Sequence, residues 1–187
     1  MTRFIYATST TLDGYLADED DSLDWLFVVE GGDEALKEIE EFNQGVAVMV
    51  EGSTTYEWVI EHEDLVANPE KWQRFYGDRK TFVFTSRPDL PRVAGADVEF
   101  VSGPVTGHEA AIREAAGEKD VWLVGGGELV GQFAAAGMLD EIWLSVAPVT
   151  LGSGAPLLPR RFESDRLLLE EVGQAGQFVQ LKYQFKK

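Results

Sequence analysis

The fold of this chain is decided by the stretch Val121-Trp122-Leu123-Val124-Gly125-Gly126-Gly127-Glu128-Leu129-Val130. An apolar run typical of a buried strand, three consecutive glycines and the start of an amphipathic helix follow one another directly. At such a junction the N–H groups of a helix N-terminus can bind a phosphate, and glycine lets an anionic ligand approach closely. Two interpretations stay open at this point: a site for a nucleotide-type cofactor, or a strand-to-helix turn that uses glycine for packing.

The length and composition indicate one globular domain. With 187 residues, 44% of them hydrophobic, we expect a single domain over residues 1–187. The chain has no cysteine, which excludes disulfides, thiolate metal ligands and cysteine nucleophiles. Its two isolated histidines, His62 and His108, do not make a zinc site by themselves, so no metal is expected.

The charge balance excludes several classes of partner. Sixteen basic and 33 acidic residues give a net charge of -17, which repels nucleic acids and anionic membranes. The N-terminus lacks the pattern of a signal peptide, and no apolar run approaches the roughly 18 residues of a membrane span, which favours the cytoplasm. An anionic ligand needs local positive charge, for which the candidates are Arg79, Lys80, Arg87, Arg160 and Arg161.

Hydrophobic periodicity predicts alternating strands and helices. Strands are expected over residues 4–8, 46–50, 81–84, 98–101, 121–124 and 141–146, and helices over residues 33–42, 53–60, 108–116 and 127–136. Residues 167–172 and 178–185 are typical of a terminal antiparallel pair. This order predicts an α/β fold with helices on both faces of a mixed, mostly parallel central sheet and an antiparallel C-terminal hairpin.

Ligands of such sheets bind beyond the carboxyl ends of the strands. Four segments occupy these ends: the turn at Asp13, Gly52–Thr55, Thr85–Arg87 and Gly125–Gly127. We therefore expect the functional site where these segments meet.

Four motifs follow one another along the chain: Ser9-Thr10-Thr11-Leu12-Asp13-Gly14-Tyr15-Leu16-Ala17, Gly52-Ser53-Thr54-Thr55-Tyr56-Glu57, Val124-Gly125-Gly126-Gly127-Glu128-Leu129 and Ala147-Pro148-Val149-Thr150-Leu151-Gly152-Ser153-Gly154-Ala155-Pro156-Leu157. In this order they resemble the dihydrofolate reductase-like superfamily, specifically bacterial proteins similar to the reductase domain of riboflavin biosynthesis. The resemblance covers nearly the whole chain and implies the three-layer α/β/α arrangement of that superfamily.

The resemblance implies a nicotinamide cofactor, usually NADPH, whose diphosphate lies between two helix N-termini. The residues that would contact this cofactor are Ala7, Gly14, Gly52, Ser53, Thr54, Thr55, Thr85, Ser86, Arg87, Val124, Gly125, Gly126, Gly127, Glu128 and Leu129. Among them, Arg87 is the expected partner of a 2'-phosphate through charge-assisted hydrogen bonds. The resemblance also implies a cis peptide bond between Gly125 and Gly126.

Two positions depart from the family pattern. Ser53 stands where related proteins often carry an arginine near the 2'-phosphate, and the acidic Glu128 follows the three glycines. NADH therefore stays open beside NADPH. The carboxylate that binds folate in true dihydrofolate reductases is not assigned, because the helix from Asp33 does not reproduce its surroundings.

Few ionisable residues are candidates for chemistry, since the cofactor transfers the hydride and the protein supplies orientation and a proton. Asp13, in the loop expected beside the nicotinamide, is the predicted catalytic residue, although an Asp before a Gly also forms turns. The predicted substrate contacts are Asp24, Trp25 and Ser153. The alternative interpretations are a surface acid for Asp24, a core aromatic for Trp25 and a glycine turn for Ser153. Core or subunit contacts are predicted for Trp58, Trp72 and Phe75.

The leading functional hypothesis is an NAD(P)H-dependent reductase that transfers a hydride to a C=N or Schiff-base carbon of a small pyrimidine-like or pterin-like substrate. It would resemble 5-amino-6-(5-phosphoribosylamino)uracil reductase. The alternatives are dihydrofolate reductase activity and a non-catalytic dimeric domain that binds a nucleotide. The resemblance also implies a homodimer, whose interface the sequence does not locate.

Overall fold

The computed structural model describes residues 1–87 and 89–186, without the side chains of residues 33–36 and 38. In this part of the chain the central sheet has eight strands: β1 (Phe4–Thr11), β3 (Val46–Gly52), β4 (Lys80–Phe84), β5 (Val98–Val101), β6 (Asp120–Gly125), β7 (Glu141–Ala147), β9 (Leu167–Ala175) and β10 (Phe178–Phe185).

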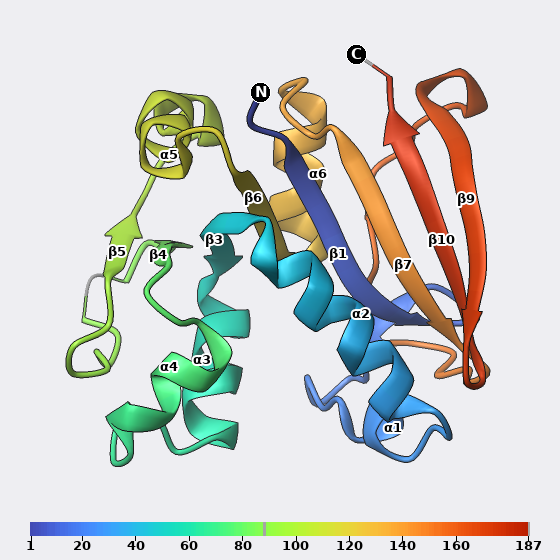
Figure 1. Cartoon of the computed structure of the whole chain (residues 1–187), viewed down its shortest axis with the longest axis horizontal. Helices are drawn as coiled ribbons and strands as arrows, with labels where there is room; N and C mark the ends of the chain where they lie inside the picture. The colour runs from blue at the N-terminus through green and yellow to red at the C-terminus, as the bar shows by residue number, and fades with distance from the viewer. Residues whose placement is uncertain (88, 187) are drawn as a thin grey trace.

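The strand order in the sheet is β5-β4-β3-β6-β1-β7-β10-β9 (Figure 1). Neighbouring strands from β5 to β7 pair in parallel. By contrast, β10 pairs antiparallel with both β7 and β9. This confirms the predicted mixed, mostly parallel sheet with an antiparallel C-terminal hairpin.

The helices connect these strands. They are α1 (Asp24–Phe27), α2 (Gly32–Gln44), α3 (Ser53–His62), α4 (Trp72–Phe75), α5 (Glu109–Ala116) and α6 (Gly127–Ala135). Short 3-10 turns occur at Pro69–Lys71, Val105–Gly107 and Ser164–Arg166, and a small second sheet pairs β2 (Tyr15–Ala17) with β8 (Ala155–Pro156). None of the helices in the described residues is long and apolar enough to cross a membrane.

Alternation along the strands gives each face of the sheet its own hydrophobic core. Phe4 of β1 packs in the core that also holds Ile112 of α5 and Phe133 of α6. The next residue, Ile5, belongs to the core on the other face, with Tyr56 of α3. Helices therefore cover both faces (Figure 1), which confirms the three-layer α/β/α arrangement.

The structure differs from the predicted elements mainly in their bounds. Strand β1 continues past residue 8 because it pairs with β7 as far as Thr11, opposite Ala147. The short elements α1, α4, β2 and β8 were not predicted, since two to four residues give no periodic signal.

One carboxyl group lies inside the core near the carboxyl end of β3. Glu51, the second-last residue of β3, is fully buried, and the Tyr76 hydroxyl lies 3.2 Å from its Oε2. Burial raises the pKa of Glu51 to about 8 because removal from water disfavours the ionised form. Glu51 is therefore a source of pH-dependent stability.

Candidate functional site

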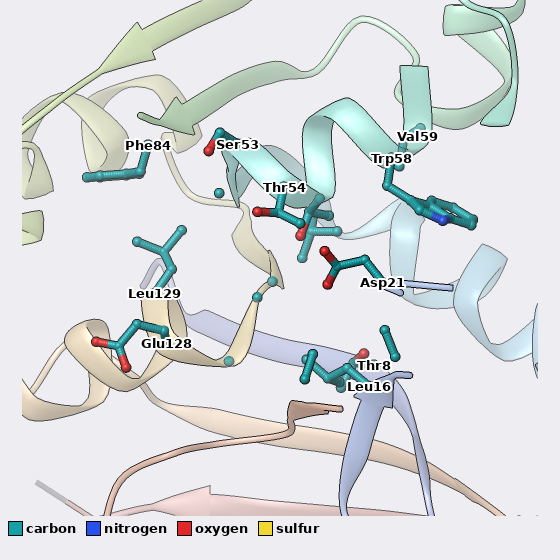
Figure 2. A pocket seen from close by; sticks show the side chains of 18 of the residues that line it. Thr8, Leu16, Asp21, Ser53, Thr54, Trp58, Val59, Phe84, Glu128 and Leu129 are labelled. Carbon is teal, nitrogen blue, oxygen red and sulfur yellow. The ribbon is translucent and has the colours of Figure 1, made fainter. Parts of the chain in front are cut away.

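A cavity of about 790 Å³ lies at the carboxyl ends of β1, β3, β4 and β6 (Figure 2). Its walls come from these strand ends, from the first turns of α3 and α6, from the loop over residues 16–26 and from β8. The cavity thus occupies the edge at which an α/β sheet positions its ligands.

Two helix N-termini meet in this cavity. The N-cap residues are Gly52 for α3 and Gly126 for α6, and neither provides a side-chain cap. A Cβ built on Gly52 would lie 3.9 Å from both the Gly125 carbonyl oxygen and the Gly126 nitrogen, so the two junctions adjoin. The first-turn N–H groups and the positive ends of both helix dipoles therefore favour a bound anion.

The hydroxyl groups of α3 add polar atoms to the same wall. Ser53 and Thr54 line the cavity (Figure 2), and so does Thr55. A Cβ on Gly125 would lie 3.7 Å from the Thr55 Oγ1, which places that hydroxyl beside the glycine junction of β6. We call this part of the cavity, residues 52–55 and 125–129, the backbone half.

Glycine occupies the three positions 125, 126 and 127 for different structural reasons. The bond between Gly125 and Gly126 is cis, as the resemblance implies, and Gly125 has a φ of 145°. A Cβ on Gly127 would collide with the carbonyl oxygens of Pro156 and Leu157, so packing explains this glycine. A Cβ on Gly126 would meet no protein atom within 4 Å. Both sequence interpretations therefore apply, at different residues: Gly127 serves packing and Gly126 keeps space open.

The other part of the cavity is lined mostly by apolar and aromatic side chains, and we call it the aromatic half. It comprises Leu16, Leu23, Trp25, Leu26, Ile39, Trp58 and Trp122, together with Asp21. The indole nitrogens of Trp25 and Trp122 donate to the carbonyl oxygens of Leu16 at 3.2 Å and Ala7 at 2.9 Å. Their rings are thus fixed, and a flat apolar ligand fits this wall.

A stack of three rings joins α1 to α3 at the rim of the aromatic half. His62 lies parallel to Trp58, with ring centroids 4.5 Å apart, and parallel to Phe27, with centroids 5.6 Å apart. Trp58 lines the cavity (Figure 2) and is therefore not the core residue that the sequence suggested, whereas Trp72 is buried in the core as predicted.

The structure brings most of the predicted site residues together. The cavity is lined by Ala7, Gly52, Ser53, Thr54, Thr55, Thr85, Ser86, Val124, Gly125, Gly126, Gly127, Glu128 and Leu129 of the expected cofactor contacts, and by Trp25 of the expected substrate contacts. The residues predicted for the site that lie outside its lining are Asp13, Gly14, Arg87, Asp24 and Ser153.

The candidate cations are engaged elsewhere. Arg87 forms a two-pronged ion pair with Glu57, which raises the pKa of its guanidinium, and Arg160 pairs with Glu128. Arg79 donates to three backbone carbonyls, at Asn43, Val46 and Tyr76. Lys80 pairs with Glu99 and Arg161 with Glu163. Of the described residues that line the cavity, none is Lys, Arg or His.

Asp13 holds two loops together. Its carboxylate accepts hydrogen bonds from the Thr11 hydroxyl at 2.6 Å and from the backbone N–H groups of Leu151 at 3.1 Å and Gly152 at 2.8 Å. These bonds, that from Thr11 foremost, lower the pKa of Asp13. In place of the predicted catalytic role we therefore propose that Asp13 is an anchor between the β1–β2 turn and the loop before β8.

Replacing Asp13 with Asn should loosen this anchor while the sheet stays folded. An amide accepts more weakly than a carboxylate, so we expect lower protection of the Leu151 and Gly152 amides in hydrogen exchange at neutral pH. Because the pKa of Asp13 is lowered, its contribution is present above the ordinary pKa and is lost as the pH falls through the lowered value. Asp20→Asn, an exposed change of the same charge, is the control; equal protection in both variants would contradict the anchor.

The remaining predicted residues have local roles, and other residues line the cavity without having been predicted. Asp24 is exposed at the start of α1, and Gly14 accepts a backbone hydrogen bond from Leu157 at 2.9 Å. Ser153 is half-buried in the loop that Asp13 anchors. The unpredicted lining residues include Asp21, whose φ of 58° gives no signal in the sequence.

Comparisons with known proteins agree with this architecture. The family model described as the RibD C-terminal domain matches residues 3–181. Uncharacterized protein YwjB of Bacillus subtilis (strain 168) is 34% identical over 176 residues, which cover 94% of this chain and 93% of YwjB.

Two solved structures share the fold. A Shewanella sp. PV-4 protein with the provisional name riboflavin biosynthesis protein matches with a TM-score of 0.79 and 22% identity, over 100% of each chain. Dihydrofolate reductase from Enterococcus faecalis, solved with NADP(H), matches with a TM-score of 0.62 and 13% identity, over 99% of this chain and 97% of the other. The chain therefore has a dihydrofolate reductase-like fold and belongs to the RibD C-terminal domain family.

Proposed function

We propose that the protein is an NAD(P)H-dependent reductase that transfers a hydride to a C=N or Schiff-base carbon of a small pyrimidine-like or pterin-like substrate. The observation that supports this most is the meeting of two uncapped helix N-termini, those of α3 and α6, across one cavity whose other half is aromatic. Family membership supports the same class of reaction.

In this proposal the backbone half holds the diphosphate. The first-turn N–H groups of α3 and α6 and the hydroxyls of Thr54 and Thr55 are its donors, and the helix dipoles each contribute on the order of 0.3–1 kcal/mol. Thr85 and Ser86, after β4, would hold the adenosine end. Ala7 would lie beside the nicotinamide, which supplies the hydride when the cofactor is bound.

A fluorescence titration tests cofactor binding directly. Trp25, Trp58 and Trp122 line the cavity, so bound NADPH should quench their emission with saturation in the micromolar range. The absence of saturation at millimolar NADPH and NADH would reject the proposal.

Two alternatives are separated by turnover. If the cofactor binds but a panel of imine, pyrimidine and pterin substrates does not oxidise it, the non-catalytic nucleotide-binding domain is favoured. The specific observation behind that alternative is the small number of ionisable groups on the wall: of the described lining residues only Asp21 and Glu128 are charged, and Glu128 is paired with Arg160. Turnover of dihydrofolate in the same assay would support the dihydrofolate reductase alternative.

The Arg87–Glu57 pair predicts how the choice between NADPH and NADH can be shifted. Glu57→Gln should release Arg87 toward a 2'-phosphate and raise the affinity for NADPH about two- to fivefold, with little change in the affinity for NADH. Arg87→Ala should lower the affinity for NADPH by a similar factor. The size follows from the 0.2–1 kcal/mol typical of exposed ion pairs, since the Arg87 side chain is 52% exposed. Glu61→Gln, an exposed change on the same helix, is the control; equal shifts for both cofactors would contradict this role of Arg87.

We also propose that the protein is a homodimer. Strands β9 and β10 leave Leu169, Val172 and Val179 between 45% and 61% exposed, which is unusual for neighbouring apolar residues on a free sheet face. Light scattering coupled to gel filtration would measure the mass, and a mass near 20.7 kDa at micromolar concentration would reject the dimer.

A further inference from the structure

Asp21 has an unusual position in the aromatic half. Its side chain extends into the cavity between Thr54 of α3 and the Thr8 and Leu16 side (Figure 2). Among the described residues, none forms a hydrogen bond or ion pair with its carboxylate. The other acid of the lining, Glu128, lies in the backbone half and is paired with Arg160. Asp21 is therefore the carboxylate that a ligand in the aromatic half meets.

The loop that presents Asp21 is held by its own hydrogen bonds. Asp18 Oδ1 accepts from the backbone N–H groups of Asp20 and Ser22, both at 2.9 Å. The Asp18 N–H donates to the Ser22 carbonyl at 3.1 Å, and the Asp21 N–H donates to the Asp18 carbonyl at 3.2 Å. Asp21 itself has a left-handed φ of 58°. The turn therefore fixes the backbone from which the exposed Asp21 side chain extends, and the carboxylate is open to a ligand.

Positively charged side chains lie outside the described lining of the cavity. Arg87 pairs with Glu57 of α3, and Arg160 pairs with Glu128 of α6. The chain as a whole has a net charge of -17. A phosphate monoester on the substrate would enter the aromatic half without a side-chain cation and beside a free carboxylate, which is unfavourable for two like charges.

We propose, resting on the reductase function above, that the aromatic half selects an unphosphorylated planar heterocycle whose ring N–H or amino group donates to Asp21. The aromatic wall supplies the flat contact, and the carboxylate accepts from neutral or protonated nitrogen. This substrate class excludes the phosphoribosyl form that the reductase of riboflavin biosynthesis is named for. The protein would then act on a related heterocycle that has lost, or never received, its phosphate.

A matched pair of probes tests the charge selection. 5-Amino-6-(ribosylamino)uracil and its 5'-phosphate differ only in the phosphate, and binding of each to the wild-type protein is followed by tryptophan quenching without cofactor. We expect the unphosphorylated probe to bind at least tenfold more tightly. Equal or tighter binding of the phosphorylated probe, or no binding of either, would overturn the proposal.

Asp21→Asn tests the carboxylate itself. In this variant the unphosphorylated probe should bind about 10- to 100-fold more weakly, the range expected for a hydrogen bond to a charged group. The NADPH dissociation constant should stay within twofold of the wild-type value. Asp20→Asn, one residue earlier and exposed, should change neither. If Asp21→Asn behaves like Asp20→Asn, the role of Asp21 is wrong even where NADPH binds. If wild-type protein binds the unphosphorylated probe but no NADPH, the reductase function fails while the substrate class stands.

Discussion

Replacing Gly126 with Ala should lower the affinity for NADPH about 100-fold and leave the stability of the protein nearly unchanged. A Cβ at this position meets no protein atom within 4 Å, and the backbone there, with φ of -75° and ψ of 176°, accepts any residue. The new methyl group would instead occupy the space in which the proposed diphosphate approaches the α6 N-terminus. A 100-fold loss corresponds to about 2.8 kcal/mol, comparable with losing one or two charge-assisted hydrogen bonds.

Gly127→Ala is the matched comparison, one residue further along. Its Cβ would collide with the carbonyl oxygens of Pro156 and Leu157, so overpacking should destabilise the fold by about 1–3 kcal/mol or more. For a chain of this length that lowers the melting temperature by roughly 3–10 °C. Calorimetry and fluorescence titration of both variants separate the two roles, and a Gly126→Ala protein that binds NADPH like wild type would contradict the assigned diphosphate site.

The second large effect concerns stability against pH, through Glu51. Its folded-state pKa of about 8 lies above the ordinary 4.5, so the folded state binds the proton more tightly than the unfolded state. The contribution is complete below pH 4.5, decreases as the pH rises, and is lost above pH 8. One pKa unit corresponds to 1.36 kcal/mol, so the difference between 4.5 and about 8 makes the full contribution of Glu51 to the free energy of unfolding about 5 kcal/mol.

Glu51→Gln should remove this dependence, because an amide stays neutral. Between pH 5 and pH 9 the wild-type free energy of unfolding should fall by about 4 kcal/mol more than that of the variant, measured from urea transitions. The exposed change Glu61→Gln should keep the wild-type slope. Parallel pH profiles for wild type and Glu51→Gln would show that Glu51 is not the titrating group.

Local pattern was sufficient to predict the sheet and the backbone half of the cavity. A strand followed by glycines and a helix is encoded in a few consecutive residues, and so Gly52–Thr55 and Gly125–Leu129 were found without knowledge of the tertiary structure. The position of the cavity then followed from the rule for parallel strand ends.

The contacts that the sequence did not predict join distant parts of the chain. Asp13, the predicted catalytic residue, accepts hydrogen bonds from N–H groups 138 and 139 residues away, which no local pattern contains. Arg87 is paired with Glu57, 30 residues earlier, across two elements whose relative position no sequence window contains. Glu51 follows an apolar run as an ordinary strand-terminal acid would, and only the packing of Tyr76 shows that it is buried.

The stack of Phe27, His62 and Trp58 makes one wall of the aromatic half depend on a ring outside it. Phe27 is 60% exposed and does not line the cavity, yet its ring supports His62, which in turn supports Trp58. A change of Phe27 would therefore alter the support of Trp58, and with it this wall, without replacing any residue that lines the cavity.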